Sequence, residues 1–539
     1  MDRALTDILK ALKYEPEKEE GFILKENLTD SYAYREPRDD TPLPAVSERL
    51  SENLGAIKRL YRVPLNHDVT LREFSFSYNG GTRRAFIVFI DGISGNALIN
   101  ENILEPLMIK SRGLSSLDSE LSDYILEALL TQNQVSVHTK IGDAVSGVNS
   151  GGCALFADGV GAAFLCDVKS WEHRGVGAPL SENVIRGPQE AFCETLRMNT
   201  ALIRKTLTDR SLVMEMTSVG RRSRTPVVIA YLCDVVNPAL LSHLKRRLQS
   251  IDADFCLDSG ELEQLIEDSG RIPAPQLRAT ERPDRACQAL CDGRIVLLVG
   301  GSPYALILPA LFTDFLYSVE DRYVRAPYAA LLRTVRIAAG FLSVFLSGIF
   351  ISVVSFHEEF LPVETLLSIQ QSSRGVAMPT FLQLLFLELL FEILHEAAIR
   401  MPRHIGAVIG ITGALVIGNS LIGANIVSPV AIICTAMSVL STFANPSYMQ
   451  NIHLRILRYL FILAGALGGL PCLCFAAIMA AALLVSLKSF GVPYFSPAAP
   501  RTKMSFLSGF KRGRIEDDFV RTDAVSPEKK YKKRPKRNG

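Results

Sequence analysis

A chain of 539 residues is too long for one ordinary domain, and a hydrophobic content of 48% is high for a purely soluble protein. The net charge of +2 conceals an asymmetry, because residues 501–539 carry 13 Lys or Arg and 5 Asp or Glu. A basic tail behind apolar segments is typical of a cytoplasmic extension that faces anionic lipid, so we expect no nucleic acid partner. The 10 cysteines show no zinc spacing and no disulfide framework, and we expect no metal and no cofactor.

The N-terminal half is predicted to be a mixed α/β domain. Residues 1–50 are charged, turn-rich and without the apolar core of a signal peptide, so we expect a mobile leader before a cytosolic domain over residues 51–328. Alternating apolar residues on both sides of Asn79-Gly80-Gly81 predict a β-hairpin. Helices are expected at 97–109, 190–207, 238–251 and 260–268, and a strand at 225–233.

Two stretches of this half resemble each other at an offset of 142 residues. Residues 144–165 align without gaps with residues 286–307, and both have the pattern of a helix end, a Gly turn, an apolar strand, a second Gly turn and a second strand. The pattern predicts two related subdomains, over residues 51–200 and 201–328. Chance similarity between two ordinary hairpins is an equal alternative.

Apolar runs lengthen and charges become sparse between residues 329 and 490, which predicts an α-helical, polytopic membrane domain of five or six helices. The six apolar segments lie at about 332–356, 378–398, 404–424, 426–444, 455–471 and 472–490. Arginine clusters, including Arg455 and Arg458 before the fifth segment, fall on the cytoplasmic side together with the tail (491–539) if all six cross. Five crossings would place the tail outside, and the short connection 422–428 also fits a re-entrant segment.

The second apolar segment carries ionisable residues on one face of its expected helix. Glu388, Glu392 and Glu396 recur at i, i+4 and i+8 with His395 alongside, within an arc of about 100°. A carboxylate at mid-bilayer costs about 2.5–3.5 kcal/mol, so these side chains should face protein or water rather than lipid. One interpretation is a cation-attracting stripe in a pore or ion path.

Structural roles are the alternative for the polar residues of this region. The glutamates would then form interhelical pairs with Arg400 or Arg403, or bond as protonated carboxyls to a neighbouring helix. The helix-packing candidates are Gly406, Gly410 and Gly465, and the polar intramembrane candidates are Asn419 and Asn425. Small residues let helices approach closely, and the asparagines fit hydrogen bonds across helices better than a cavity lining.

The α/β half offers no arrangement of residues for catalysis. Asp158-Gly159-Val160-Gly161 resembles half of a dinucleotide-binding motif, but it lies between two expected strands, which favours a turn. The run Arg221–Arg224 fits a solvated charge cluster better than a phosphate site. We therefore expect no catalytic residues, and an enzyme is the least favoured class of function.

Several strings resemble those of the A subunit of bacterial spore germinant receptors, the GerA family. In the α/β half they are IRGPQEAF at 185–192, NTALIR at 199–204, LDSG at 257–260, TERPD at 280–284 and EDRY at 320–323. FEILHEAAIRMP at 391–402 is similar to the family's FEILREAGxRLP, with His395 and Ala398 in place of Arg and Gly. GALVIG at 413–418 and VSP at 427–429 also fit, so the resemblance covers about residues 75–500.

The resemblance implies a multi-pass subunit in the spore inner membrane, with its N-terminal domain and tail in the cytoplasm, that triggers germination in response to nutrients. It implies a transporter-like B subunit and a lipoprotein C subunit as partners. It further implies a homo-oligomer of about five copies that forms a nutrient-gated channel for monovalent cations, in agreement with the glutamate stripe. A non-conducting scaffold subunit and a sporulation-operon paralogue that amplifies germination are the alternatives. A solute carrier is less favoured, because the spans show no inverted repeat.

Overall fold

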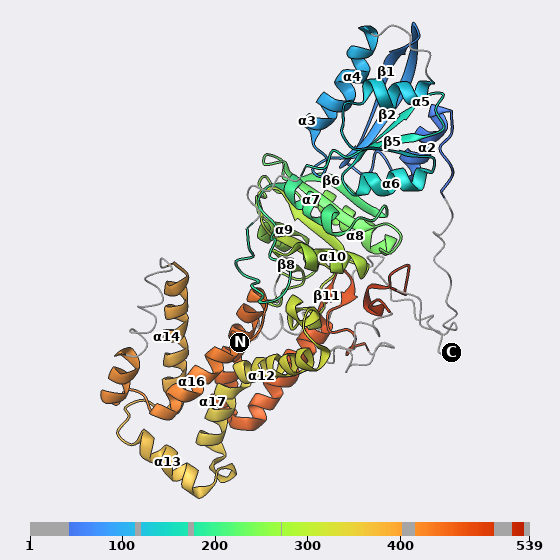
Figure 1. Cartoon of the computed structure of the whole chain (residues 1–539). Coiled ribbons are helices and arrows are strands. Elements are labelled where there is room, and N and C mark those ends of the chain that lie inside the picture. The colour runs from blue at the N-terminus through green and yellow to red at the C-terminus, as the bar shows by residue number, and fades with distance from the viewer. Residues whose placement is uncertain are drawn as a thin grey trace, which may run out of the picture.

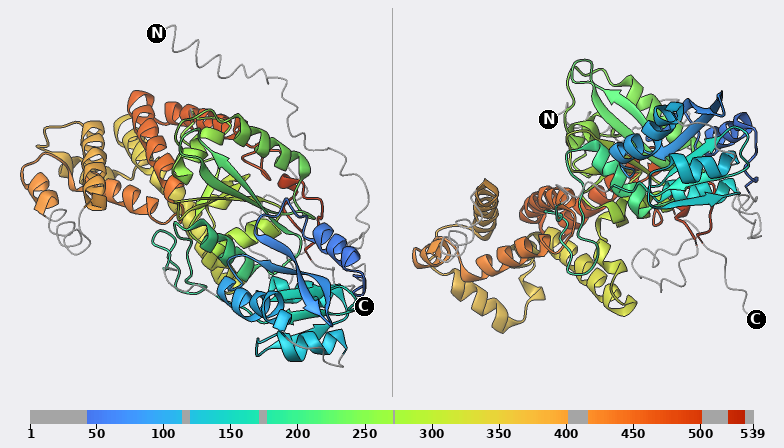
Figure 2. Two further views of the ribbon diagram at one scale, coloured as in Figure 1. Left: turned by 90° about the horizontal axis from the view of Figure 1, so that it is seen from above. Right: turned by 45° about the horizontal axis from the view of Figure 1, so that its top comes forward.

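The computed structural model describes residues 43–113, 120–170, 177–270, 272–400, 416–500 and 520–532. An α/β part with two sheets stands above an all-helical part, as the chain is drawn in Figure 1. The second and third views show the helical part extending away from the sheets to one side (Figure 2). The α/β part therefore forms a body distinct from the apolar helices.

The first sheet begins with the predicted hairpin. β1 (Val69–Tyr78) and β2 (Gly81–Ile90) pair antiparallel, and Asn79 and Gly80 between them have φ values of +49° and +73°, the left-handed backbone that an Asn-Gly turn favours. The other strands are β3 (Val135–His138), β4 (Cys153–Ala157) and β5 (Ala163–Cys166), in the order β1-β2-β4-β5-β3.

Apolar cores cover both faces of this sheet. One face packs against α2 (Leu50–Leu60) and α6 (Ile141–Asn149). The other face packs against a chain of short helical segments. These are α3 (Asn96–Ile99), η1 (Asn100–Leu104), α4 (Glu105–Met108), η2 (Lys110–Gly113), α5 (Leu121–Asp123) and η3 (Tyr124–Leu129).

The second sheet has the same architecture. Its strands β6 (Leu212–Val219), β7 (Thr225–Leu232), β8 (Arg278–Thr280), β9 (Ile295–Val299) and β10 (Ala305–Leu308) follow the order β6-β7-β9-β10-β8. One core lies under α7 (Leu196–Thr206) and α10 (Pro283–Cys291), and the other under α8 (Pro238–Ser250) and α9 (Ser259–Ile266). α11 (Phe312–Phe315) and η4 (Val319–Arg322) then lead to the helical part.

The internal repeat extends to topology and turns. β9 begins 142 residues after Cys153 at the start of β4, and β10 begins 142 residues after Ala163 at the start of β5. Glycines in the left-handed region recur at the same offset, because Gly151 has φ +98° and its counterpart Gly293 has φ +88°. A shared order of five strands is not expected of two unrelated hairpins, which favours duplication.

Two expected boundaries differ from the structure. Residues 43–50 pack on the first sheet, where Val46 and Leu50 are buried in the core, so the leader is at most residues 1–42, which lie outside the described residues. α7 packs against α10, which moves the boundary between the subdomains before Leu196. The predicted leader extended too far, and the predicted boundary between the subdomains lay too late in the chain. Polar residues around isolated buried apolar residues resemble a loop in sequence.

The helical part contains α12 (Ala326–Phe356), η5 (Glu358–Phe360), α13 (Val363–Ser373), α14 (Thr380–Arg400), α16 (Pro429–Thr442) and α17 (Tyr448–Ser486). Among the described helices, α12 and α17 are long and apolar enough to cross a membrane. The fifth and sixth expected segments form the single element α17, which bends at Gly468 and Gly469. α16 has 14 residues, or about 21 Å of helix, which is shorter than the ~30 Å of a hydrocarbon core.

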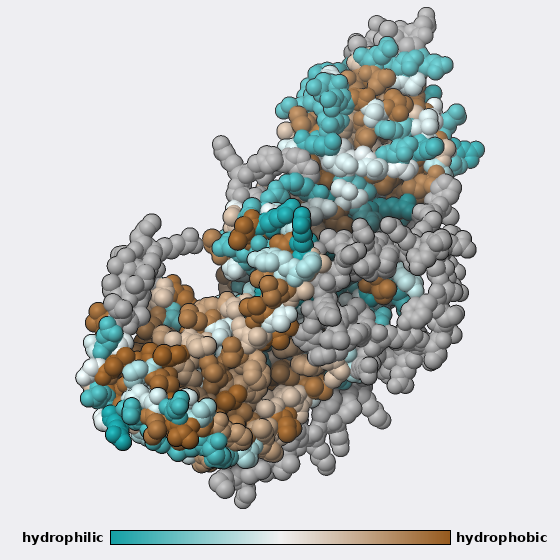
Figure 3. Space-filling model, turned by 60° about the horizontal axis from the view of Figure 1, so that its bottom comes forward, coloured by the Kyte–Doolittle hydropathy of each residue, from teal (hydrophilic) through white to brown (hydrophobic). Residues whose placement is uncertain are grey.

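The six predicted crossings thus remain a prediction. Much of the third segment, 404–424, lies outside the described residues. The surface of the helical part is nonetheless strongly apolar, whereas hydrophilic residues dominate the surface of the α/β part (Figure 3). The exposed side chains behind this contrast include Leu389, Ile393, Leu440, Leu467 and Phe475.

After α17 the chain returns to the second α/β subdomain. The small hairpin of β11 (Lys488–Ser489) and β12 (Val492–Pro493) places Phe490 in that subdomain's core. The Ser489 hydroxyl donates to the Gln276 carbonyl at 2.6 Å. The expected sixth span, which ran to residue 490, is therefore too long, because its last residues belong to this hairpin. Apolar residues that enter a soluble core resemble the end of a span in sequence.

Candidate functional site

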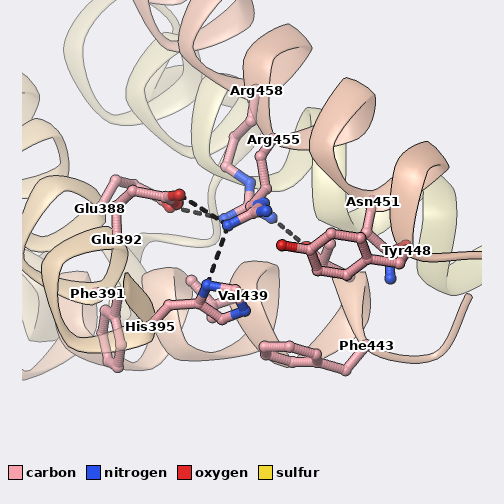
Figure 4. Close-up of a pocket in the computed structure, with 11 residues that line it drawn as sticks. Glu388, Phe391, Glu392, His395, Val439, Phe443, Tyr448, Asn451, Arg455 and Arg458 are labelled. Atoms are coloured by element: carbon pink, nitrogen blue, oxygen red, sulfur yellow. Dashed lines mark hydrogen bonds and ion pairs between the residues drawn. The ribbon is translucent and has the colours of Figure 1, made fainter. Parts of the chain in front are cut away.

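Ionisable side chains from two helices meet in a cavity of about 70 Å³ between α14, α16 and α17. Glu388, Glu392 and His395 reach it from α14, and Arg455 and Arg458 from α17 (Figure 4). The face of α14 that the sequence predicted to avoid lipid thus points toward other helices. Opposite charges face each other across the cavity.

The innermost pair is an ion pair shielded from water. Arg458 Nη1 lies 2.7 Å from Glu388 Oε2, and the two side chains are 3% and 2% exposed. The Ser347 hydroxyl of α12 donates to the other carboxylate oxygen at 3.2 Å. Arg458 Nε donates to the Ser343 carbonyl at 2.6 Å, and Nη2 donates to the Ser438 carbonyl of α16 at 3.3 Å. One guanidinium therefore joins α12, α14, α16 and α17.

The second pair is partly exposed. Arg455 Nη1 lies 2.7 Å from Glu392 Oε1, and the Glu392 side chain is 45% exposed. The same Arg455 nitrogen lies 3.3 Å from His395 Nδ1. Because arginine only donates, Nδ1 accepts and the imidazole proton is on the other nitrogen. This pair sits at the open side of the cavity.

The third glutamate points outward. Glu396 pairs with Arg400 one turn later, with 2.6 Å between Oε1 and Nη2, and its side chain is 61% exposed. The sequence alternative was pairing between helices with Arg400 or Arg403, whereas this pair lies within α14 and Arg403 lies outside the described residues. Exposure therefore rises along the stripe from the buried Glu388 to the outer Glu396.

Sequence reasoning missed the partners of the two inner glutamates. Arg455 and Arg458 were expected in a cytoplasmic connection before the fifth segment, but both lie within α17. The sequence does not reveal the pairing, because an arginine near the end of an apolar run looks the same whether it ends a span or neutralises a buried carboxylate. The available signal was the count of three glutamates on one helix face, which calls for cations on a neighbouring helix.

Close packing against α12 holds α17, which carries the two arginines of the cavity. A Cβ added to Gly465 would lie 2.6 Å from the Gly348 carbonyl oxygen, and a Cβ at Gly348 would lie 2.7 Å from the Phe461 carbonyl oxygen. Each glycine thus removes the side chain that would separate the helices. Gly465 was a helix-packing candidate, Gly348 was not, and Gly406 and Gly410 lie outside the described residues.

The two polar candidates Asn419 and Asn425 lie away from the cavity. Both are exposed on the structure, in or after the helical residues 416–423. Asn425 has φ +50°, a left-handed conformation that asparagine tolerates, and its carbonyl accepts from the Ala377 amide at 3.3 Å. Its backbone therefore makes the turn into α16.

The chain resembles known proteins over most of its length. Residues 56–535 match the family described as Bacillus/Clostridium GerA spore germination protein. Spore germination protein KA of Bacillus subtilis (strain 168) is 33% identical over 487 residues, which cover 90% of this chain and 88% of that protein. Spore germination protein GerLA of Bacillus cereus is 34% identical over 453 residues, with coverages of 84% and 91%.

One solved structure is also similar in sequence. It is the crystal structure of the N-terminal domain of the A subunit of the Bacillus megaterium spore germinant receptor GerK3. It is 30% identical and covers 50% of this chain and 98% of that chain, with a TM-score of 0.40.

Proposed function

Because this chain belongs to the Bacillus/Clostridium GerA family of spore germination proteins, we propose that it is a membrane subunit of a nutrient germinant receptor that triggers spore germination. The match over residues 56–535, which includes the α/β part, the apolar helices and the tail, carries this proposal. The subunit acts by binding and conformational change rather than by catalysis. A transporter-like subunit and a lipoprotein subunit complete the receptor.

Within that receptor, copies of this chain assemble around a cation path lined by α14. The supporting observation is the exposure of Glu392 and Glu396 beside the exposed apolar side chains of Leu389 and Ile393. A carboxylate that faces lipid costs about 2.5–3.5 kcal/mol, so this edge needs water or another copy of the chain beside it. A ring of such edges, five in a pentamer, would concentrate monovalent cations.

Both ends of the helical part are anchored on the second α/β subdomain, which favours a membrane protein with both termini in the cytoplasm of the spore. α12 begins at Ala326 directly after that subdomain, and Phe490 returns to its core after α17. A chain that leaves a body and returns to it crosses the membrane an even number of times. Six crossings satisfy this condition and five do not.

A non-conducting scaffold is the second candidate. The buried pair of Glu388 and Arg458 favours it, because that carboxylate is already neutralised and its arginine partner joins four helices. In a scaffold, Glu392 and Glu396 would contact partner subunits and no ion would pass them.

The two functions differ in their response to neutral glutamines at the exposed end of the stripe. Cation release from spores after addition of a rich nutrient mixture is measured for a chain with Glu392→Gln and Glu396→Gln. The matched control carries Glu358→Gln and Glu359→Gln, which lie between α12 and α13 away from the cavity. Slower release in the first variant alone, at equal protein level, is expected for the channel; equal release in both would favour the scaffold.

A further inference from the structure

The duplicated α/β unit contains a slot beside the turn that follows its second strand. In the first subdomain, the chain leaving β5 fills this slot: the Gly95 amide donates to the Val168 carbonyl at 2.7 Å, and the Ser170 amide donates to the Ile93 carbonyl at 3.3 Å. Residues 168–170 therefore run as a short extra strand along residues 93–95. The side chain of Lys169 lies over Gly151.

In the second subdomain the corresponding stretch is diverted. The residues after β10 turn toward the hairpin of β11 and β12, where the Ala310 amide donates to the Ser489 hydroxyl at 3.0 Å and the Phe312 amide to the Tyr494 carbonyl at 2.9 Å. This path leads directly into α11 and α12. The turn after β7, at the offset of 142 residues, is thus left without its local partner.

The C-terminal segment occupies the vacated slot. The Glu528 amide donates to the Val235 carbonyl at 2.9 Å, and the Asn237 side chain donates to the Ser526 carbonyl at 3.1 Å. Pro527 lies over Gly293, the counterpart of Gly151. The contacts occur at positions equivalent to those of residues 168–170, with the Asn237 side chain in place of the Gly95 amide as donor, although the filling segment comes from the other end of the chain.

Core burial and ion pairs reinforce this docking. Val525 is fully buried in the core of the second subdomain, under β7 and β9. Lys529 Nζ lies 2.6 Å from Asp234 Oδ2, and Lys532 Nζ lies 2.7 Å from Asp292 Oδ1. Arg521 Nε donates to the Cys291 carbonyl at 2.5 Å. Lys529 and Lys532 belong to the basic tail that was expected to face anionic lipid, but in the structure they form ion pairs within the protein.

We propose that the second α/β subdomain is a peptide-binding site whose ligand is the chain's own C-terminal segment, residues 520–532. The segment completes a duplicated fold that the insertion of the helical part left open. It acts as a latch: by binding there, it holds the C-terminal end of the apolar helices on the second α/β subdomain. The subdomain and the tail bind each other in the same copy of the chain.

A charge-reversal experiment on the full chain in detergent micelles tests the latch. Hydrogen exchange of residues 524–531 is measured for Asp234→Lys, for Lys529→Asp and for the double variant. Each single reversal should speed exchange about tenfold or more, because a partly buried attraction becomes a repulsion, and the double variant should restore slow exchange. Asp252→Lys, an exposed position on the same subdomain that pairs with Arg221, should leave it unchanged.

Four results would overturn the proposal. Residues 524–531 of the native chain would exchange at the rate of an unfolded peptide, or neither single reversal would change the rate. Protection that disappears on dilution to monomers would place the tail on a second copy instead. Protection that is lost when phosphatidylglycerol vesicles replace phosphatidylcholine vesicles would assign the tail to anionic lipid.

Discussion

At the scale of single residues, the pair of Glu388 and Arg458 changes what the glutamate stripe means. A carboxylate that accepts from a buried guanidinium and a serine hydroxyl adds no net charge to a pore. Removing one partner of such a pair leaves the other buried and uncompensated, which costs about 3–5 kcal/mol. Its first role is therefore to hold the helices together.

We accordingly predict that Glu388→Gln lowers the thermal stability and the membrane abundance of the chain. Glu396→Gln, which removes an exposed pair on the same helix, should cost less than about 0.5 kcal/mol. Thermal unfolding in detergent compares the two variants with the native chain. Equal melting temperatures for all three would show that the buried pair contributes nothing to the fold.

A second prediction concerns pH and the α/β part. Burial raises the pKa of Glu263, on α9, to about 7, and repulsion from Glu267 adds to the shift. Between pH 4.5, the ordinary pKa, and about 7 the folded state holds a proton that the unfolded chain has lost. The free energy of unfolding therefore falls as the pH rises through this window, by at most about 3 kcal/mol.

Glu263→Gln stays neutral and should remove this part of the pH dependence. The measurement is the melting temperature of the α/β part at about pH 5 and about pH 8 in each variant. Glu194→Gln, an exposed carboxyl on the same subdomain, serves as the control and should keep the native dependence. The account of Glu263 fails if its glutamine variant loses as much stability between the two pH values as the native chain.

At the scale of elements, the crossing of α12 and α17 sets the position of Arg458. Gly465→Ala or Gly348→Ala would place a methyl group against backbone of the opposite helix, and overpacking of this kind costs about 1–3 kcal/mol. Gly418→Ala, at a helical position with no atom within 4 Å, should be neutral. Thermal unfolding and recovery of assembled receptor report the difference. Wild-type behaviour of both crossing variants would contradict the close approach.

The elements that could be predicted from sequence have local signals. The Asn79-Gly80 hairpin and the repeat at 142 residues follow from turn glycines and strand alternation within short windows. The pairing of Glu388 with Arg458 joins residues 70 positions apart, and no local pattern specifies which arginine comes back to α14. Phe490 was assigned to a span because apolar residues look alike in a membrane and in a soluble core.

At the scale of the whole molecule, the helical part is held at both ends by one α/β subdomain. α12 leaves it at Ala326, the hairpin at Phe490 returns to it, and residues 520–532 dock on it again. A displacement of that subdomain would therefore move α12 and α17 together, and with them the arginines that face α14. This arrangement offers a route by which a signal at the α/β part reaches the proposed cation path.

The most direct test of that path asks whether the charge at position 392 controls cation flow. Receptor complexes that carry Glu392→Cys are reconstituted in liposomes and treated with an anionic or a cationic methanethiosulfonate, with Leu467→Cys, an exposed position on α17, as control. We predict that the anionic reagent restores nutrient-triggered cation release, that the cationic one suppresses it, and that neither changes the control. Release that is unaffected by both reagents at position 392 would contradict a cation path along α14.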